Sequence, residues 1–387
     1  MIAKFRVFLF TALILFSSSL FAQTESCNLR ISLLTCSPGE ELYSTFGHSA
    51  LRVTDLSTRT DIVYNYGTFD FYDPQFYSKF VRGKLLYYLA QENFTDFRQD
   101  YIDENRSIIE QELNLSCEEK LQVQKALFVN LRGDNKFYKY DFLFDNCTTR
   151  LRDLIKSKPG TNFKTDSILP AGKTTFRNLI HYYLDKGGMP WSKLGIDMLL
   201  GSKIDRASTN EEAMFLPDYL EKGFDSTHES GKNLVASKKT IYEAPPLDNS
   251  GGIFTPFFLF TALLLICLIA SMFKNSGTRR FFNIADFILF LATGLIGWLI
   301  VFMWTATDHI VCRNNFNILW AIPLNLFAAF FIRSDKSWVK SYFKAITIID
   351  ILLLVTWFFL PQQLNTALIP LVILLAFRSW RRSRLQN

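Results

Sequence analysis

Apolar residues are spread very unevenly along the chain, and their pattern divides it into a soluble part and a membrane part. Between residues 27 and 240, short stretches that alternate apolar and polar residues are mixed with stretches of helical period. This mixture predicts an α+β domain rather than alternating βαβ units. Beyond residue 253 apolar residues form five long runs, at about 254–273, 282–304, 315–332, 343–360 and 364–378. Because each is near the roughly 20 residues that a helix needs to cross a bilayer, the last being short, the pattern predicts an all-α five-helix transmembrane bundle.

Strand patterns dominate the beginning of the soluble part. Residues 30–36, 48–56 and 61–69 are predicted to be strands, with a turn at 57–60 between the last two. Helical spacing follows over 94–108, and Ser116 with Glu119 forms a capping box that opens a further helix ending near Gly133.

The ends of the chain predict export and membrane insertion. Residues 1–22 have the order of a secretory signal peptide, in which a basic start precedes a short apolar core and a small residue, Ala22. We therefore expect 23–242 to be a periplasmic catalytic domain and 243–252, EAPPLDNSGG, to be a linker. Residues 253–380 are then the transmembrane domain, and 381–387 form a basic cytoplasmic tail.

Basic residues in the gaps between the apolar runs agree with this topology. The gaps predicted to face the cytoplasm, together with the C-terminus, hold ten lysines and arginines, namely Lys274, Arg279, Arg280, Arg333, Lys336, Lys340, Arg378, Arg381, Arg382 and Arg384. The two gaps predicted to face outward hold one, Arg313. Since positive residues favour the cytoplasmic side, the protein is predicted to be a multi-pass protein of a bacterial inner (cytoplasmic) membrane.

Composition excludes several classes of function. The formal net charge of +6 reflects these membrane-flanking residues, and because no nucleic-acid-binding motif is present, no nucleic acid is expected as a partner. The four histidines and six cysteines have no zinc-binding spacing, so we predict no metal and no cofactor. Cys27, Cys36 and Cys117 would lie in an oxidising compartment and could include a disulfide, whose pairing the sequence does not assign.

The strongest candidate for chemistry is Cys147. An aromatic, strand-like run over 138–144 ends at Asp145 and Asn146, which are both good helix N-cap residues. A helical pattern begins at Cys147, and a cysteine at a helix N-terminus has a lowered pKa that favours the reactive thiolate. The alternative is a buried structural thiol.

His48, in the segment FGHSALRV, is the candidate base for that thiol. The predicted strand after it carries Asn65, which is placed to orient an imidazole, although a role at a strand end is the alternative. A histidine on a strand followed by a cysteine at a helix start resembles the circularly permuted papain-like fold, whose members include the NlpC/P60 and lecithin:retinol acyltransferase groups. Members of this fold often act on lipids, which the thiol takes up as an acyl thioester.

Other residues are candidates for substrate binding. Arg52 and Arg150 lie near the pair in sequence, and either guanidinium could hold a phosphate or carboxylate, with structural ion pairs as the alternative. Tyr64 and the aromatic residues that follow it could line an acyl groove or simply pack in the core.

A second polar group is predicted between the membrane runs, in TATDHIVCRNNFNILW. Asp308 and His309 lie at the outer end of the second run, and Asn315 opens the third. Polar residues beside membrane spans are functional candidates by default, with a plain interfacial loop as the alternative. On the predicted topology, this group faces the same side of the membrane as Cys147.

Taken together, FGHSALRV, VYNYGTFDF, YDFLFDNCTTR and TDHIVCRNNFNILW resemble the Lnb-type lipoprotein N-acyltransferases of Bacteroidota over nearly the whole mature chain. The resemblance implies that an acyl chain moves from a glycerophospholipid to the α-amino group of a diacylated lipoprotein. Cys147 would be the nucleophile and His48 the base. Two other functions stay open: a membrane-anchored cysteine peptidase or amidase acting on cell-wall peptides, and a non-catalytic sensor or interaction protein.

Overall fold

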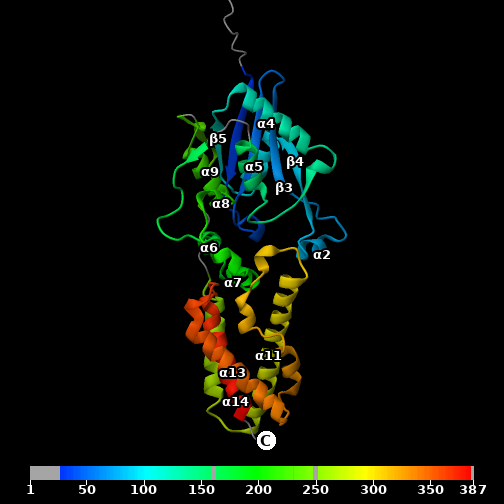
Figure 1. Ribbon diagram of the computed structural model, residues 1–387, viewed down its shortest axis with the longest axis vertical. Helices are drawn as coiled ribbons and strands as arrows, with labels where there is room; N and C mark the ends of the chain where they lie inside the picture. The colour runs from blue at the N-terminus through cyan, green and yellow to red at the C-terminus, as the bar shows by residue number, and fades with distance from the viewer. Residues whose placement is uncertain (1–26, 158–162, 230, 247–251, 385–387) are drawn as a thin grey trace, which may run out of the picture.

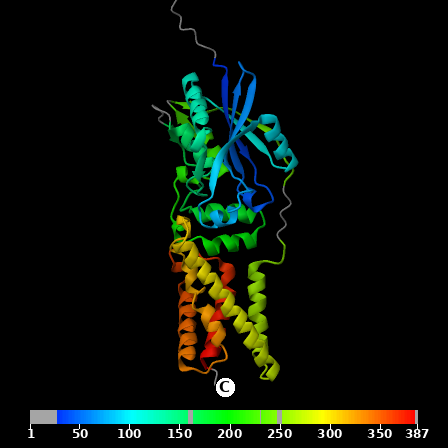
Figure 2. The same ribbon diagram turned by 90° about the vertical axis from the view of Figure 1, so that its right-hand side faces the viewer.

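The computed structural model places an α+β domain on top of a bundle of apolar helices, one above the other along the long axis (Figures 1 and 2). It describes residues 27–157, 163–229, 231–246 and 252–384. The predicted signal peptide, the middle of the predicted linker and the end of the basic tail lie outside these residues.

The α+β domain is built on an antiparallel sheet of seven strands, in the order β10-β5-β1-β2-β3-β4-β6. The strands are β1 (Leu29–Cys36), β2 (His48–Asp55), β3 (Thr60–Thr68), β4 (Leu86–Asn93), β5 (Ile108–Leu113), β6 (Phe137–Lys139) and β10 (Val235–Tyr242). β1 and β2 pair along their whole length, from Leu29 opposite Asp55 to Cys36 opposite His48. The three strands predicted at the start of the domain, and the turn between the last two, are confirmed.

Helices cover both faces of this sheet because its strands alternate apolar side chains between the two sides. One face carries the main core, against which pack α4 (Cys117–Asn130), α5 (Cys147–Lys156) and α9 (Pro217–Asp225). The other face is covered by α3 (Phe94–Asp103), whose Phe97 is buried with Leu34 and Val63. The capping box of Ser116 and Glu119 opens α4 as predicted.

Two predicted elements are shorter in the structure. The helix expected over 94–108 ends at Asp103, because Asn105 adopts a left-handed conformation with φ of +52° and Ile108 already begins β5. The aromatic run over 138–144 forms a strand only up to Lys139. It then turns, and Asp141 and Asp145 exchange two backbone hydrogen bonds of 3.0 and 2.9 Å. This turn delivers the chain to the start of α5.

The cysteines of the domain fall into different states. Cys27 and Cys117 form a disulfide that joins the segment before β1 to the first turn of α4. Cys36 is fully buried and free, and burial raises the pKa of its thiol to about 12. Of the three cysteines considered for a disulfide, Cys36 is therefore the one left out.

Smaller elements complete the α+β domain. α6 (Phe176–Lys186) and α7 (Pro190–Leu199) form the layer that rests on the helical bundle (Figure 2). α8 (Asn210–Ala213) precedes α9, and a short sheet joins β7 (Phe163–Thr165), β8 (Thr227–Glu229) and β9 (Lys232–Asn233).

The helical domain contains α10 (Pro256–Ala270), α11 (Ser276–Thr305), α13 (Ser337–Thr356) and α14 (Ile369–Arg384). Among the described residues, α11 and the helix from Ser337 to Phe359 are long and apolar enough to cross a membrane, and α10 is apolar but shorter.

The third apolar run, 315–332, is not one continuous helix. A 3-10 turn at Phe316–Leu319 comes first, and the short α12 (Asn325–Ala328) follows with a second 3-10 turn directly after it. The chain turns between them at Pro323, which has no N–H to continue a helix. The bent segment packs directly on α11, where a Cβ on Gly297 would lie 2.1 Å from the Ala321 carbonyl oxygen. Glycine on α11 thus permits a contact of backbone with backbone.

Candidate active site

Cys147 occupies the first position of α5, and the residue before it fixes that helix start. The Asn146 side-chain oxygen accepts hydrogen bonds from the N–H groups of Thr148 and Thr149, at 2.9 and 2.8 Å. Its amide nitrogen donates to the carbonyls of Phe142 and Phe215, at 2.9 and 2.8 Å. Because Asn146 is buried and fully used, it holds the start of α5 rigidly and aims Cys147 at the neighbouring strands.

His48 is the first residue of β2, and Asn65 lies on the adjacent strand β3. The His48 Nε2 atom lies 3.1 Å from the Asn65 Oδ1 atom. Since Oδ1 can only accept a hydrogen bond, Nε2 carries the hydrogen, and Nδ1 is left to face the thiol of Cys147 as a base. The structure thus brings the three predicted catalytic residues together.

Glu92 on β4 extends this series, and the sequence analysis missed it. The Asn65 side-chain nitrogen donates a hydrogen bond to the Glu92 carboxylate. A carboxylate accepts hydrogen bonds only, so it fixes which end of the Asn65 amide faces His48. Nothing in the segment AQEN marks Glu92, because its role depends on the pairing of β3 with β4.

The electrostatics of the pair favour a thiolate. Burial raises the pKa of the Cys147 thiol, but the charge and hydrogen bond of His48 outweigh it, with help from Thr148 and the Ser49 N–H. The pKa falls from 9.0 to about 7. Burial alone would lower the pKa of His48, whereas the charge and hydrogen bond of Cys147 raise it above its usual 6.5. Each group therefore stabilises the charged form of the other.

Because Gly67 on β3 has no side chain, a small space remains beside the thiol of Cys147. Its φ of +92° is a conformation that favours glycine, and a Cβ there would lie 3.4 Å from the Cys147 Cβ atom. The same position lies 3.9 Å from a ring carbon of Tyr140 and 4.0 Å from the Tyr138 hydroxyl. Cys147 and the two tyrosines thus surround one small space.

Tyr138 is unusual among these neighbours. Its hydroxyl is buried and has no hydrogen-bond partner in the described part of the chain. Burial, and then the nearby charge of Cys147, raises the pKa of Tyr138, so the hydroxyl stays protonated. An unpaired buried donor is costly in a folded protein, and its position beside a nucleophile indicates a functional use. The sequence analysis placed Tyr138 in a strand and assigned it no role.

A cavity of about 420 Å³ opens on the histidine side of the pair. It is lined by Tyr43, Ser44, Gly47, His48, Asn65, Tyr66, Gly67, Thr68, Glu92, Phe97, Asp100, Tyr101, Glu104 and Arg106. A molecule that enters it contacts His48, Asn65 and Gly67 directly.

Three residues predicted to bind substrate, Arg52, Tyr64 and Arg150, make ion pairs or pack in the core. Arg52 pairs with Asp61 at 2.6 Å and Glu110 at 3.0 Å, and its guanidinium lies 3.4 Å from the centre of the Phe94 ring. Tyr64 is buried in the main core.

Arg150 forms a two-pronged ion pair with Asp145, at 2.6 and 2.8 Å, and stacks on Tyr138. Internal carboxylates thus engage both guanidiniums and Tyr64 packs in the core, and substrate binding by these three residues stays a prediction.

The polar loop of the membrane domain is held against the α+β domain. His309 Nε2 lies 3.1 Å from the Phe80 carbonyl oxygen, and Asp308 pairs with Lys139 at 3.1 Å. Asn315 is buried and donates to the carbonyls of Met198 and Leu199 at the end of α7. Asn315 is thus part of the junction between the domains, and its role in substrate binding stays a prediction.

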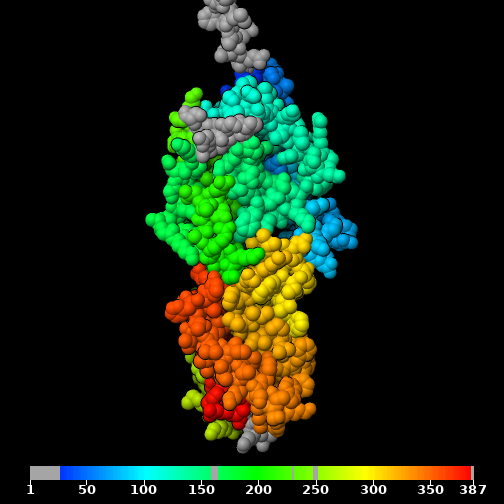
Figure 3. Space-filling view, viewed as in Figure 1, coloured from blue at the N-terminus to red at the C-terminus, as the bar shows by residue number. Residues whose placement is uncertain are grey.

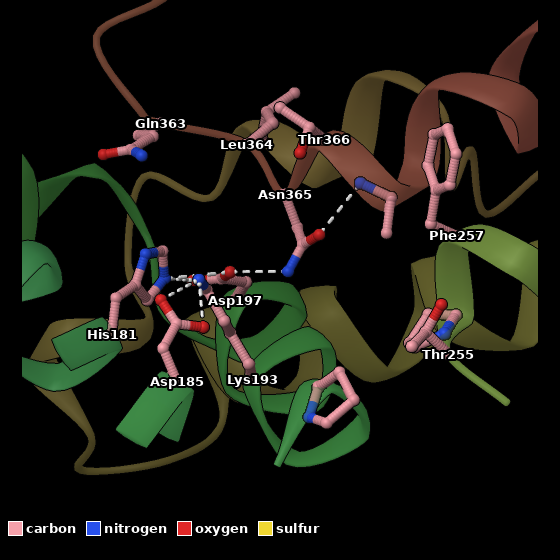
Figure 4. A pocket seen from close by; sticks show the side chains of 13 residues that line it. His181, Asp185, Lys193, Asp197, Thr255, Phe257, Gln363, Leu364, Asn365 and Thr366 are labelled. Carbon is pink, nitrogen blue, oxygen red and sulfur yellow. Dashed lines mark hydrogen bonds and ion pairs between the residues drawn. The ribbon is translucent and has the colours of Figure 1, made fainter. Parts of the chain in front are cut away.

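A second cavity, of about 260 Å³, lies at this junction between α6, α7, the start of α10 and residues 363–367 (Figure 4). Asp197 on its wall is held by His181 at 2.8 Å and by the Asn365 amide at 2.9 Å. Lys193 pairs with Asp185 at 2.7 Å. These charged groups satisfy one another, and neither Cys147 nor His48 lines this cavity.

Fold and site together define a membrane protein whose exported α+β domain carries a paired thiol and imidazole. The chain belongs to the Lnb family. Residues 17–182 match the Lnb N-terminal periplasmic domain, and residues 248–387 match the Lnb transmembrane domain. The α+β domain is accordingly periplasmic, and the apolar helices form the transmembrane domain. No curated protein and no solved structure matches the chain.

Proposed function

We propose that the protein is a thiol-dependent lipoprotein N-acyltransferase of the bacterial inner membrane. The observation that carries this proposal is the pairing of Cys147, at a helix start, with His48 and Asn65, on a domain seated directly on membrane helices. A thiolate near neutral pH is the nucleophile that acyl transfer through a thioester needs. Membership of the Lnb family supports the proposal.

The first half-reaction takes an acyl chain from a glycerophospholipid. His48 accepts the thiol proton of Cys147, and the thiolate attacks the ester carbonyl carbon. The tetrahedral intermediate collapses as the carbon–oxygen bond breaks, and the leaving alkoxide takes the proton back from His48. The products are a Cys147 thioester and a lysophospholipid.

The negative oxygen of that intermediate needs hydrogen-bond donors. Backbone N–H groups at a helix start can supply such donors, but those of Thr148 and Thr149 already donate to Asn146. This leaves the Cys147 N–H as the donor of that turn without an acceptor among the described residues. The Tyr138 hydroxyl, also unpaired and beside the same space, is the second donor we propose.

The second half-reaction delivers the acyl chain to the diacylated lipoprotein. The free α-amino group attacks the thioester, His48 removes a proton from the nitrogen, and the carbon–sulfur bond breaks to restore the thiolate. The product is an N-acylated lipoprotein. Neither half-reaction requires a metal, a cofactor or a nucleic acid.

We also propose a circularly permuted papain-like fold for the periplasmic domain. Its support is the order of the elements: His48 on a strand comes first, its Asn65 partner lies on the next strand, and the cysteine opens a helix that packs on β2 and β3. Residues 1–22 remain the proposed signal peptide, and 381–387 the cytoplasmic tail.

The test uses the full-length purified protein with phospholipid vesicles and a diacylated lipopeptide that has a free N-terminal amine. Mass spectrometry should detect the triacylated lipopeptide and an equal amount of lysophospholipid. Cys147→Ala should abolish both products, whereas Cys36→Ala is the matched control, because Cys36 is buried and free. Full activity of the Cys147→Ala protein would refute the proposal.

A further inference from the structure

The segment between β3 and β4 exposes a group of large aromatic side chains to solvent. The relative exposures are 67% for Phe71, 95% for Tyr72, 80% for Tyr77 and 50% for Phe80. α2 (Phe76–Val81) carries two of these residues. Burying such side chains in an apolar phase is favourable, so their exposure in a protein domain needs an explanation.

Contacts with the membrane domain fix the position of this segment relative to the transmembrane helices. The Phe80 carbonyl meets the His309 side chain, and the Asp308 N–H donates to the Arg82 carbonyl at 2.9 Å. Gly83, with φ of +68°, packs so closely that a Cβ there would lie 3.3 Å from Asp308 and from His309. Asp308 follows directly after α11, which ends at Thr305. The aromatic segment therefore lies at the outer end of a transmembrane helix.

The surface around the segment is that of a membrane interface. On the last turns of α11, Trp298, Leu299 and Phe302 are exposed and face the surroundings of the bundle. In the space-filling view, the segment (light blue) protrudes beside the loop that follows α11 (yellow) (Figure 3). Arg82 and Lys84, just beyond α2, are also exposed. Aromatic rings with basic neighbours are typical of protein surfaces at the level of lipid headgroups.

A continuous series of aromatic rings leads from this segment to the thiol. Phe80 stacks with Phe76 at 6.1 Å between ring centres, and Phe76 with Phe69 at 5.7 Å. Phe69 meets Tyr87 at 5.1 Å, and Tyr87 stacks on Tyr140 at 4.3 Å. Tyr140 borders the space beside Gly67 and Cys147.

We propose that residues 69–84 dip into the outer leaflet of the inner membrane, and that the exposed end of this aromatic series, at Phe71 and Phe80, receives the phospholipid acyl chain on its way to Cys147. The occupant is a membrane lipid rather than a protein, because the exposed rings continue the lipid-facing surface of α11. The loop of Asp308 and His309 then has a structural task, since it holds the segment at the bilayer. The role of the series as an acyl path rests on the proposed thioester chemistry, whereas insertion of the segment does not.

Insertion is tested first, by a measurement that needs no activity. The full-length protein is placed in vesicles of phosphatidylethanolamine and phosphatidylglycerol that contain a phospholipid with a photoreactive diazirine on its acyl chain. After illumination, peptide mass spectrometry should find label within residues 69–84 as well as in the membrane helices. Label confined to the membrane helices would overturn the proposal.

The path is tested with the double variant Phe71→Ser/Phe80→Ser. Two donors are compared for thioester formation on Cys147, a long-chain phospholipid in vesicles and a water-soluble short-chain ester. The ratio of the vesicle rate to the soluble rate should fall at least about tenfold, since the two rings no longer contact the acyl chain. Phe128→Ser is the matched control, because Phe128 is 44% exposed on α4, away from the bundle.

The outcomes separate the two proposals. If the double variant keeps the wild-type ratio, or loses both rates equally, the aromatic series is not the acyl path. If the wild-type protein forms no thioester from either donor, the proposed function has failed, and the photolabelling alone then decides whether the segment meets the membrane.

Discussion

The Glu92 carboxylate accepts a hydrogen bond from the side-chain nitrogen of Asn65, and this contact turns the amide oxygen toward His48. An asparagine amide alone has two orientations of similar shape, of which only one suits the imidazole. Glu92 thus acts on His48 through Asn65.

Removing that carboxylate should slow catalysis without removing the nucleophile. We predict that Glu92→Ala lowers kcat for thioester formation by about tenfold. This is less than the loss expected on removing a general base itself, because Glu92 acts only through Asn65. Glu92→Gln should retain most activity, because its amide oxygen can still accept the Asn65 hydrogen bond. Equal losses in the two variants would show that the charge of Glu92 matters rather than its orienting contact.

The reactivity of Cys147 should follow pH with a midpoint near 7. The thiolate is the form present above its pKa, so alkylation by iodoacetamide should accelerate as the pH rises from about 6 to 8. His48→Ala removes the stabilising charge but not the burial, and the midpoint should then move upward, to at least the ordinary value of 9.0. Alkylation rates measured from below pH 7 to well above the ordinary thiol pKa of 9.0 locate both midpoints, with Cys147→Ala as the blank. An unchanged midpoint in His48→Ala would show that His48 does not lower the pKa of the Cys147 thiol.

Tyr138→Phe distinguishes the proposed oxyanion donor from a packing residue. The loss of one such donor costs roughly 100-fold in rate, so acylation by an ester should slow by about that factor. Alkylation by iodoacetamide develops no oxyanion and should keep its wild-type rate. Tyr66→Phe is the control, because the Tyr66 hydroxyl belongs to the same aromatic cluster but is paired with Asn130 at 2.6 Å. Similar acylation rates in the two variants would remove Tyr138 from the mechanism.

Local chemistry explains what the sequence could predict. An N-cap acts on the two or three residues after it, so Asn146 and Cys147 could be placed at a helix start from adjacent letters. The hairpin of β2 and β3 is equally local, and it brings His48 and Asn65 together on neighbouring strands. Long apolar runs marked the membrane part because the bilayer sets their length.

Contacts between distant segments could not be predicted from the sequence. Arg52 meets Glu110, 58 residues away, and Asn315 meets Met198, 117 residues away, so neither partner is visible as a pattern. Their side chains looked available for a substrate only because the tertiary neighbours were unknown. The turn in the third apolar run likewise depends on a close contact with Gly297 of α11, which the sequence does not reveal. Pro323 is the one local residue in the run that disfavours a continuous helix.

The proposed transfer and its alternative, hydrolysis, would both pass through a Cys147 thioester, so the two differ in what attacks that thioester. Water is abundant, and a transferase must therefore hold its amine close and keep the thioester dry. The proposed site, linked by aromatic rings to residues 69–84, is suited to both tasks if the lipid-bound acceptor that we propose reaches it along the membrane interface.

We predict that a diacylated lipopeptide with a free amine is N-acylated in amounts that match the lysophospholipid released, and that blocking the amine stops acylation. His309→Ala loosens the contact with Phe80 and should reduce transfer from vesicles, with Phe128→Ser as the control. Mass spectrometry measures how much of the acyl chain ends on the lipopeptide and how much is released as free fatty acid. Free fatty acid as the main product, or cleavage of the lipopeptide, would mean that water or a peptide bond is the true second substrate and that the protein is a hydrolase.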